Sequence, residues 1–445
     1  MNIVLPENVR TIIERLEGCG HEAYAVGGCV RDSVLGKKPA DWDITTSALP
    51  SQVKEMFPKT VDTGIVHGTV TVLLGGGAYE VTTYRVDGEY EDARHPREVS
   101  FTKSLPEDLR RRDFTVNAMA YNEREGLVDL FGGLEDLKKR IIRCVGDPLE
   151  RFTEDALRML RAVRFCAQLG FSMETETREA IRALAPSIGR VSAERIRTEL
   201  EKLLVSDHPQ MIRQVYETGL SAVFLPELDE MMTTSQHCKH HCYRVGDHTI
   251  AALEWTPADR ILRLSALLHD VAKPTVKTTD ERGWDHFYRH EQEGAAMARG
   301  ILRRLKFDND TTRKVCALVG SHDRRPAADQ ESVRRAMVDI GLEAFPRLFA
   351  LKRADVMAQG CYRRREKLRG IEDFERLYRE ILDQGQCLSL RELKVGGADL
   401  IAMGAKQGTV IGDVLRHLLD WVLEDPERNR RDLLLEEAAR CLTNI

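Results

Sequence analysis

Two glycines and two aspartates near the N-terminus have the types and spacing that phosphate chemistry needs. Gly27 and Gly28 follow a β-type segment and precede a short predicted helix, and Asp41 and Asp43 stand two positions apart. Glycines let the backbone approach a ligand closely, and amide groups at a helix start attract phosphate. On a strand, side chains at i and i+2 leave the same face. Two carboxylates placed in this way suit a pair of Mg²⁺ ions that activates a hydroxyl and stabilises a leaving pyrophosphate.

Each motif is weak evidence when taken alone. Tight turns use Gly-Gly constantly, and most D-x-D sequences are solvated strand edges. The combination of the two at this spacing favours nucleotidyl transfer. Further along the chain, Arg112 and Asp113, with Asn117 one helical turn later, could hold a ribose and a triphosphate.

A third group lies in residues 154–161, where a helix is predicted. Asp155 and Arg158 stand at i and i+3, which is usually an ordinary surface ion pair of small value. As a site, the pair is a hydrogen-bond template, because the carboxylate accepts from an amino group and the guanidinium donates to a ring nitrogen or carbonyl. Cytosine and adenine offer an amino group in that place, whereas uracil and guanine offer a carbonyl.

Several motifs in fixed order closely resemble the bacterial class II CCA-adding enzymes and their relatives, the bacterial poly(A) polymerases. They are G-G-C-V-R-D (27–32), D-W-D (41–43), R-R-D-F-T-V-N-A (111–118), D-L-F-G-G (129–133), E-D-A-L-R-M-L-R-A-V-R-F (154–165) and V-S-A-E-R-I (191–196). The resemblance spans residues 22–205 and resumes at 393–401. It implies a nucleotidyltransferase head, followed by helical parts that hold the acceptor arm of tRNA, with CTP and ATP as substrates.

The resemblance also implies roles for individual residues. It assigns them as Mg²⁺ ligands (Asp41, Asp43), triphosphate contacts (Gly27, Gly28, Arg31, Asp32), ribose and phosphate contacts (Arg112, Asp113, Asn117) and base-selecting or other nucleotide contacts (Glu154, Asp155, Arg158, Arg161). Glu80 is a candidate third carboxylate. Residues 85–96 resemble the flexible loop that accompanies switching from C to A addition.

A second set of candidate ligands lies in a helical region of the C-terminal half. Adjacent His269 and Asp270 end the apolar helix predicted at 261–268, which is typical of a metal site inside a helical bundle. The whole set resembles the HD superfamily of metal-dependent phosphohydrolases, which implies a metal quartet and two extra ligands of two-metal members (His248, His269, Asp270, Asp355; His290, His322). A degenerate HD fold kept as a scaffold is the alternative.

The elements that must position these residues change in type along the chain. Residues 22–26, 42–44, 68–74 and 78–84 are strand-like, and short helices are predicted at 30–35 and at 50–57 after a Ser47 cap. From about residue 133 the pattern is helical. We therefore predict an α+β fold: a small mixed-sheet nucleotidyltransferase head (1–132), then an all-helical neck (133–206), HD-type body (207–385) and tRNA-binding tail (386–445).

Composition limits the class of protein. The chain has 445 residues, is 42% hydrophobic and 31% charged, and carries a net charge of −5, so basic patches, not total charge, must bind any polyanion. No apolar run reaches membrane-span length and the N-terminus lacks signal-peptide features, which predicts a cytoplasmic protein. The ten cysteines are interpreted as thiols. Cys238 and Cys242, among histidines, could suggest zinc, but a turn leading into another His site is favoured.

Two other functions compete with CCA addition. An A-adding enzyme or poly(A) polymerase shares most motifs, but the switching loop and the tail segment argue against it. A catalytically inactive RNA-binding or nucleotide-sensing protein would be expected to lose Asp41 or Asp43, and both are present.

Overall fold

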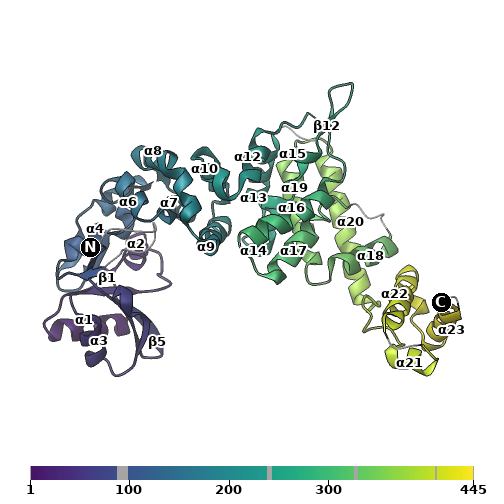
Figure 1. Ribbon diagram of the computed structural model, residues 1–445, viewed down its shortest axis with the longest axis horizontal. Coiled ribbons are helices and arrows are strands. Elements are labelled where there is room, and N and C mark those ends of the chain that lie inside the picture. Colours follow the sequence, from purple (N-terminus) through teal and green to yellow (C-terminus); the bar gives the residue numbers. More distant parts are fainter. Residues whose placement is uncertain (1, 88–98, 238–242, 325–328, 406–407, 444–445) are drawn as a thin grey trace. The chain divides into compact units, whose positions relative to one another are not determined.

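The computed structural model describes residues 2–87, 99–237, 243–324, 329–405 and 408–443. It divides into two compact units, Met1–Asp229 and Glu230–Ile445. Unit 1 contains the only large sheet of the described part, whereas unit 2 is almost entirely helical (Figure 1).

A seven-stranded mixed sheet organises the first unit, in the order β3-β4-β5-β2-β1-β8-β9. Its strands are β1 (Ala23–Val26), β2 (Asp43–Thr46), β3 (Thr60–Gly64), β4 (Thr69–Leu74), β5 (Gly77–Thr83), β8 (Met119–Asn122) and β9 (Gly126–Asp129). Neighbouring strands are antiparallel except β2 and β5, which run parallel. A separate antiparallel pair, β6 (Arg85–Asp87) and β7 (Val99–Phe101), follows β5.

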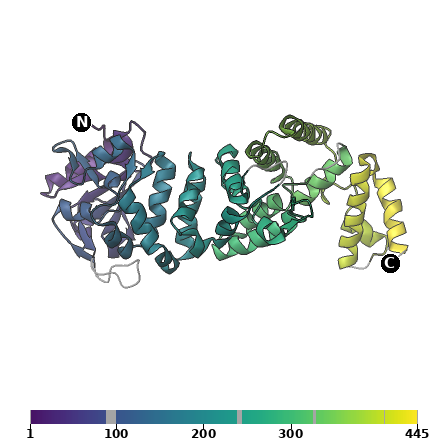
Figure 2. The same cartoon turned by 90° about the horizontal axis from the view of Figure 1, so that it is seen from above.

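Helices cover the centre of this sheet, which is why β1 is buried along its whole length. The helices α1 (Glu7–Gly18) and α3 (Pro50–Met56) contact each other and the strands, and α2 (Gly28–Val34) packs on β1 and β8 (Figure 2). The apolar face of α1, with Val9, Ile12, Ile13 and Leu16, is buried because it repeats at helical spacing.

The rest of the first unit is mainly helical. Its helices are α4 (Leu105–Arg110), α5 (Gly133–Lys139), α6 (Pro148–Glu154), α7 (Leu157–Leu169), α8 (Thr175–Leu184), α9 (Ala193–Leu204), α10 (Ile212–Glu217) and α11 (Ser221–Phe224), and α12 (Pro226–Thr233) contains the division. The buried helix α7 packs on α9, and α6 packs on α8.

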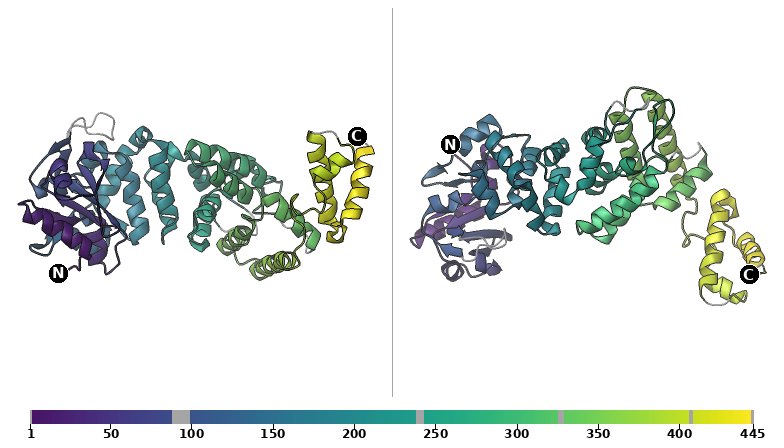
Figure 3. Two further views of the ribbon diagram at one scale, coloured as in Figure 1. Left: turned by 90° about the horizontal axis from the view of Figure 1, so that it is seen from below. Right: turned by 45° about the horizontal axis from the view of Figure 1, so that its top comes forward.

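The second unit begins with a helical bundle and ends with a group of three helices, drawn in yellow in Figure 3. The bundle has α13 (Val245–Trp255), α14 (Arg260–Leu268), α15 (Lys273–Val276), α16 (His290–Arg304), α17 (Asn309–Val319), α18 (Gln330–Ile340), α19 (Phe345–Ala358) and α20 (Arg364–Asp383). The C-terminal group has α21 (Gly397–Ala402), α22 (Thr409–Glu424) and α23 (Arg431–Thr443).

The predicted α+β architecture agrees with these elements, with local differences. The helical remainder also contains two short strand pairs, β10 (Ile141–Ile142) with β11 (Ser172–Met173) and β12 (Thr278–Thr279) with β13 (Asp285–His286). The predicted Ser47 cap is wrong: Leu49 is the N-cap of α3, and the Ser47 hydroxyl accepts from the Glu22 amide. None of the described helices is long and apolar enough to cross a membrane.

Candidate active sites

Three carboxylates gather where β2 begins. The β2–β5 register pairs Ile44 with Val81, so Asp43 and Glu80 occupy neighbouring positions on parallel strands. Burial and the negative charges of Glu80 and Asp41 raise the pKa of the Asp43 carboxyl, against the opposing charge of Arg112. A divalent cation would relieve this repulsion, and hard oxygen ligands are the type that Mg²⁺ prefers, so these residues fit the metal that the motif implies.

The glycine turn brings a backbone segment against two arginines. Gly27 has φ 82°, and a Cβ placed there would lie 3.3 Å from Nη1 of Arg112. Both the positive φ and this close approach require glycine. The next residue, Gly28, opens α2 and lies beside the Arg31 guanidinium. The sequence-predicted residues Gly27, Gly28, Arg31 and Arg112 are therefore brought together.

A buried carboxylate that the sequence interpretation missed anchors the arginine side of this turn. Asp108 accepts hydrogen bonds from Arg111 (Nε, 2.9 Å), from Arg112 (Nη2, 3.2 Å) and from the Thr45 hydroxyl (3.0 Å) on β2. Burial opposes its charge, but the two arginines hold the pKa of Asp108 below its usual value. The spacing of Asp108 and Arg112 at i and i+4 was the available signal.

A second carboxylate, Asp113, is the hub of the remaining motif residues. It accepts from Arg161 (Nε 2.9 Å, Nη2 2.6 Å) and from the Asn117 amide (3.2 Å). The Asn117 carbonyl oxygen in turn accepts from Arg31 (2.6 Å), which also pairs with Asp32 at 2.8 Å. Burial works against the charge of Asp113, yet Arg161 lowers its pKa to about 2. Three motifs far apart in the sequence thus form one network.

Asp113→Ala is expected to lower the free energy of unfolding by about 2–4 kcal/mol, because it removes the nearest carboxylate of the partly exposed Arg161 and leaves the more distant Glu199, at 3.7 Å. Since the pKa of Asp113 falls from 3.8 to about 2 on folding, its contribution is complete above pH 4 and is lost as the pH drops towards 2. Denaturant unfolding of wild type and Asp113→Asn from pH 7 to pH 3 checks this. A stability difference that stays constant down to pH 3 would contradict it.

The predicted Asp155–Arg158 template takes a different form from the one expected. Asp155 does not continue a helix: α6 ends at Glu154, and Asp155 is extended (φ −140°, ψ 102°), with its carboxylate accepting from the Leu157 amide at 3.0 Å. The prediction of one helix through this segment is wrong, because Asp155 instead bonds the first turn of α7.

Asp155 and Arg158 each have a partner of their own, in place of the ion pair expected between them. Asp155 binds Arg195 of α9 (2.8 Å), a residue that sequence reasoning missed because it lies 40 positions away. Arg158 binds Glu154 (2.6 Å) and donates to the Arg111 carbonyl (3.0 Å). Both side chains are mostly buried and held in place by separate neighbours.

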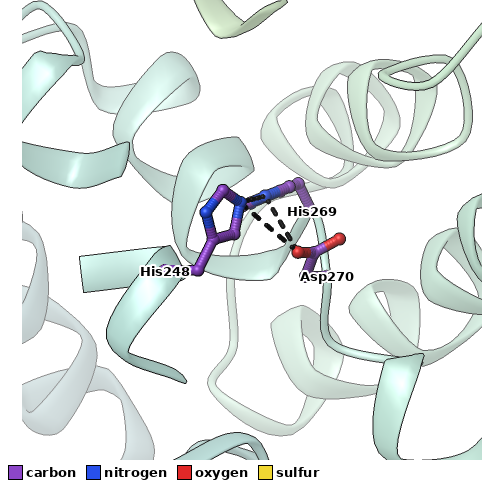
Figure 4. Close-up of side chains that lie close together, drawn as sticks. All are labelled: His248, His269 and Asp270. Atoms are coloured by element: carbon purple, nitrogen blue, oxygen red, sulfur yellow. Dashed lines mark hydrogen bonds and ion pairs between the residues drawn. The ribbon is translucent and has the colours of Figure 1, made fainter. Parts of the chain in front are cut away.

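The six predicted HD residues come together inside the bundle of the second unit. Asp270 bridges two groups: its Oδ2 lies 3.3 Å from Nε2 of His269 and 3.6 Å from Nε2 of His248, and its Oδ1 lies 3.6 Å from His290 and 3.7 Å from His322. Asp355 lies 3.0 Å from His248. The residues come from α13, the end of α14, the start of α16, the segment after α17, and α19; Figure 4 shows three of them.

The ring orientations suit metal binding. The Nδ1 atoms of His269, His290 and His322 each donate to a backbone carbonyl, at 2.7, 2.9 and 2.7 Å. A carbonyl can only accept, so each Nδ1 carries hydrogen and each Nε2 points at Asp270 as an available ligand. The ligand atoms of His248, His269 and Asp270, and those of Asp270, His290 and His322, form two triads, each within 4.8 Å.

Charge at this cluster is balanced by a lysine that the sequence interpretation did not single out. Lys273 lies 2.8 Å from Oδ2 of Asp270 and donates to Gln236 at 2.9 Å. Although burial opposes ionisation, His269 and Lys273 hold the pKa of Asp270 well below its usual range. The residues Cys238 and Cys242 lie outside the described residues, as do residues 88–96 of the predicted switching loop.

Comparison with known proteins gives the same order of parts. The family "Poly A polymerase head domain" matches residues 23–143, "Probable RNA and SrmB- binding site of polymerase A" matches 170–232, and "HD domain" matches 239–359. A CCA-adding enzyme from Anoxybacillus flavithermus is 36% identical over 433 residues, which are 96% of this chain and 95% of that protein. The chain belongs to the CCA-adding enzymes.

Other CCA-adding enzymes support the assignment. One from Lactobacillus delbrueckii subsp. bulgaricus is 54% identical over 211 residues, 47% of this chain and about half (53%) of that protein. The crystal structure of the Bacillus stearothermophilus CCA-adding enzyme in complex with CTP has a TM-score of 0.75 at 31% identity, covering 99% of this chain and 100% of that one. The predicted family, α+β fold class and nucleotidyltransferase activity are confirmed.

Proposed function

We propose that the sheet unit of this CCA-adding enzyme transfers CMP and AMP from CTP and ATP to the 3′ end of tRNA at the carboxylates Asp41 and Asp43. The observation that carries the proposal is the β2–β5 register, which puts Asp43 beside Glu80 at the start of β2, with Asp41 two residues before it. Glu80 is proposed as a third carboxylate of the site.

The surrounding side chains divide the work of binding. Mg²⁺ held by Asp41 and Asp43 would supply charge stabilisation for the attacking hydroxyl and the leaving pyrophosphate. Gly27 and Gly28 leave room for a triphosphate, and Arg31 and Arg112 carry positive charge to it. Asp32 and Asn117 hold Arg31, and Asp108 holds Arg112. Asp113 binds Asn117 and Arg161, and with Asn117 and Arg112 it would position the ribose and phosphates.

Base choice is assigned to Asp155 and Arg158. The Asp155 carboxylate accepts from Leu157 and twice from Arg195, whereas two carboxylate oxygens offer about four acceptor sites. Asp155 therefore keeps capacity to accept from the amino group of C or A. Glu154 fixes Arg158, which would donate to the neighbouring ring acceptors. UTP or GTP would aim a carbonyl at the carboxylate, at a cost of about 1–3 kcal/mol.

Asp155→Ala is expected to relax discrimination against UTP and GTP by about one to two decades and to slow incorporation of CTP and ATP. Arg158→Ala should have the same direction, and Glu154→Ala a weaker effect. Single-turnover incorporation of each nucleotide is the measurement, with Glu150→Ala, an exposed carboxylate on the same α6, as the matched control. If both variants keep the wild-type preference, the base is selected elsewhere.

For the HD domain we propose a metal-dependent phosphohydrolase that acts on phosphate esters such as nucleotides or 2′,3′-cyclic phosphates. The converging Nε2 atoms around buried Asp270 support it, since His and carboxylate ligands with this orientation hold transition metals. A divalent metal there would supply Lewis-acid activation of a phosphate.

Three further predictions stand beside these proposals. They are the four-part division of the chain at 1–132, 133–206, 207–385 and 386–445, the contacts of the tail with the tRNA acceptor arm, and the cytoplasmic localisation.

A further inference from the structure

The hairpin β12–β13 presents aromatic rings to solvent immediately before an HD ligand. Its register pairs Thr278 with His286, and the chain then runs directly into His290 at the start of α16 (Figure 1). Trp284 is 40% exposed and Tyr288 is 70% exposed. The His286 and Tyr288 rings are stacked, with centroids 5.4 Å apart and planes 5° from parallel. We call Trp284, His286 and Tyr288 the aromatic platform.

Alternation about the short strand β13 explains why Trp284 and His286 face outward, while Tyr288 lies in the turn that follows. Between them, Asp285 is buried and accepts from the Thr279 hydroxyl (2.7 Å), from Lys277 (2.9 Å) and from the His237 amide (2.8 Å). Because successive strand residues face opposite sides, anchoring Asp285 inward places its even-numbered neighbours outward.

Polar contacts hold the His286 ring and the backbone of the hairpin turn before any ligand binds. Asp280 bonds Nε2 of His286 at 3.1 Å, and it also accepts from the amides of Arg282 and Trp284 at 2.9 Å each. Large exposed aromatic side chains fixed by polar contacts lose little further freedom when a flat ligand stacks on them. The hairpin therefore has the properties of a preorganised stacking surface.

Contacts connect the aromatic platform to the HD cluster. The Phe287 carbonyl accepts from Nδ1 of His290 at 2.9 Å. Lys273, which lies 2.8 Å from Asp270, is 5.3 Å from the centroid of the Phe287 ring. Arg289 has φ 60°, a left-handed turn that lets Tyr288 face solvent while His290 enters the cluster. The platform thus begins two residues from a ligand.

We propose that the aromatic platform stacks the bases of a nucleotide or single-stranded RNA end whose phosphate is processed at the His/Asp cluster. The proposal rests on the phosphohydrolase function proposed above and names its substrate class. Every base has a flat π face, so a row of exposed rings beside a phosphate-processing centre recognises nucleic acid without sequence preference. A protein partner could bind exposed rings without any phosphate-processing site beside them. The position of the aromatic platform next to the His/Asp cluster therefore favours a nucleotide.

The test compares two substrates that differ only in the base. Adenosine 2′,3′-cyclic phosphate and methyl riboside 2,3-cyclic phosphate are hydrolysed by wild type, Trp284→Ala and Tyr288→Ala in the metal-loaded full chain. Each variant should lower kcat/KM for the adenosine compound about 5- to 100-fold, mainly through KM, and leave the base-free compound within about twofold. Trp255→Ala, which removes another exposed ring (57%) at the end of α13, should change neither.

Equal losses on both substrates, or no loss on either, would overturn the proposal. A wild-type chain that hydrolyses neither substrate removes the phosphohydrolase function but leaves stacking open to a direct measurement. Titration with adenosine 2′,3′-cyclic phosphate should quench tryptophan fluorescence in wild type and not in Trp284→Phe. Identical quenching curves for the two proteins would show that no base stacks on Trp284 and would overturn the proposal.

Discussion

Asp43→Ala and Asp41→Ala are each expected to lower the rate of nucleotide addition by about 1000-fold or more while leaving tRNA binding nearly unchanged. The carboxylates would hold the ions that carry transition-state charge, and losing about 4 kcal/mol of that stabilisation corresponds to three decades in rate. Single-turnover addition of CMP to tRNA lacking CCA measures the rate, and filter binding measures the affinity for tRNA.

The matched control for these variants is Asp62→Ala, which removes an exposed carboxylate from edge strand β3 of the same sheet. It should keep nearly wild-type turnover. The raised pKa of Asp43 comes from burial and from its carboxylate neighbours, so Glu80→Gln should move this pKa back towards its ordinary value. Near-normal turnover by Asp43→Ala in magnesium would disprove the assignment of the site.

Asp270→Ala is expected to remove two divalent ions per chain and all phosphohydrolase activity, because Asp270 belongs to both ligand triads. His290→Ala should remove one, since His290 belongs to only one triad. Elemental analysis after loading with Mn²⁺ or Zn²⁺ and dialysis gives the count. CCA addition should stay within about twofold of wild type, because the head carboxylates lie in the other compact unit.

Asp310→Ala serves as the control for that experiment, since it removes an exposed carboxylate of α17 that pairs with Lys314 outside the cluster. Its metal content should equal that of wild type. A wild-type chain that binds no metal in the cluster, with no hydrolysis of cyclic phosphates, would favour the scaffold interpretation of the HD domain.

Sequence patterns over a few residues predicted the strands and turns that carry the glycine and aspartate motifs of the first site. The strand before Gly27 and the D-x-D segment were found because β-branched residues, glycines and turn residues mark them. The strands β8 and β9 were not predicted, because β8 is a short, fully buried run without alternation. The helix break at Asp155 was missed although Asp is a good N-cap residue, since helical spacing continues on both sides of it.

Contacts between distant segments could not be obtained from periodicity. Arg195 reaches Asp155 only because α9 folds onto α7. Asp113 meets Arg161 only because the fold brings α7 against a segment 48 positions earlier in the chain. The HD ligands were found through a family resemblance, since two aspartates and four histidines spread over several helices have no spacing rule of their own. Lys273 was missed there although it stands at i+3 from Asp270, and Gln236 was missed because only packing brings it to Lys273.

The most direct test of the account is incubation of the wild-type chain with tRNA lacking CCA, with each nucleoside triphosphate alone and in combination, and products resolved at single-nucleotide length. The account predicts two additions with CTP alone, a third only when ATP is also present, and no addition with UTP or GTP. Long A tracts with ATP alone, or a single A added only to tRNA ending in CC, would contradict it.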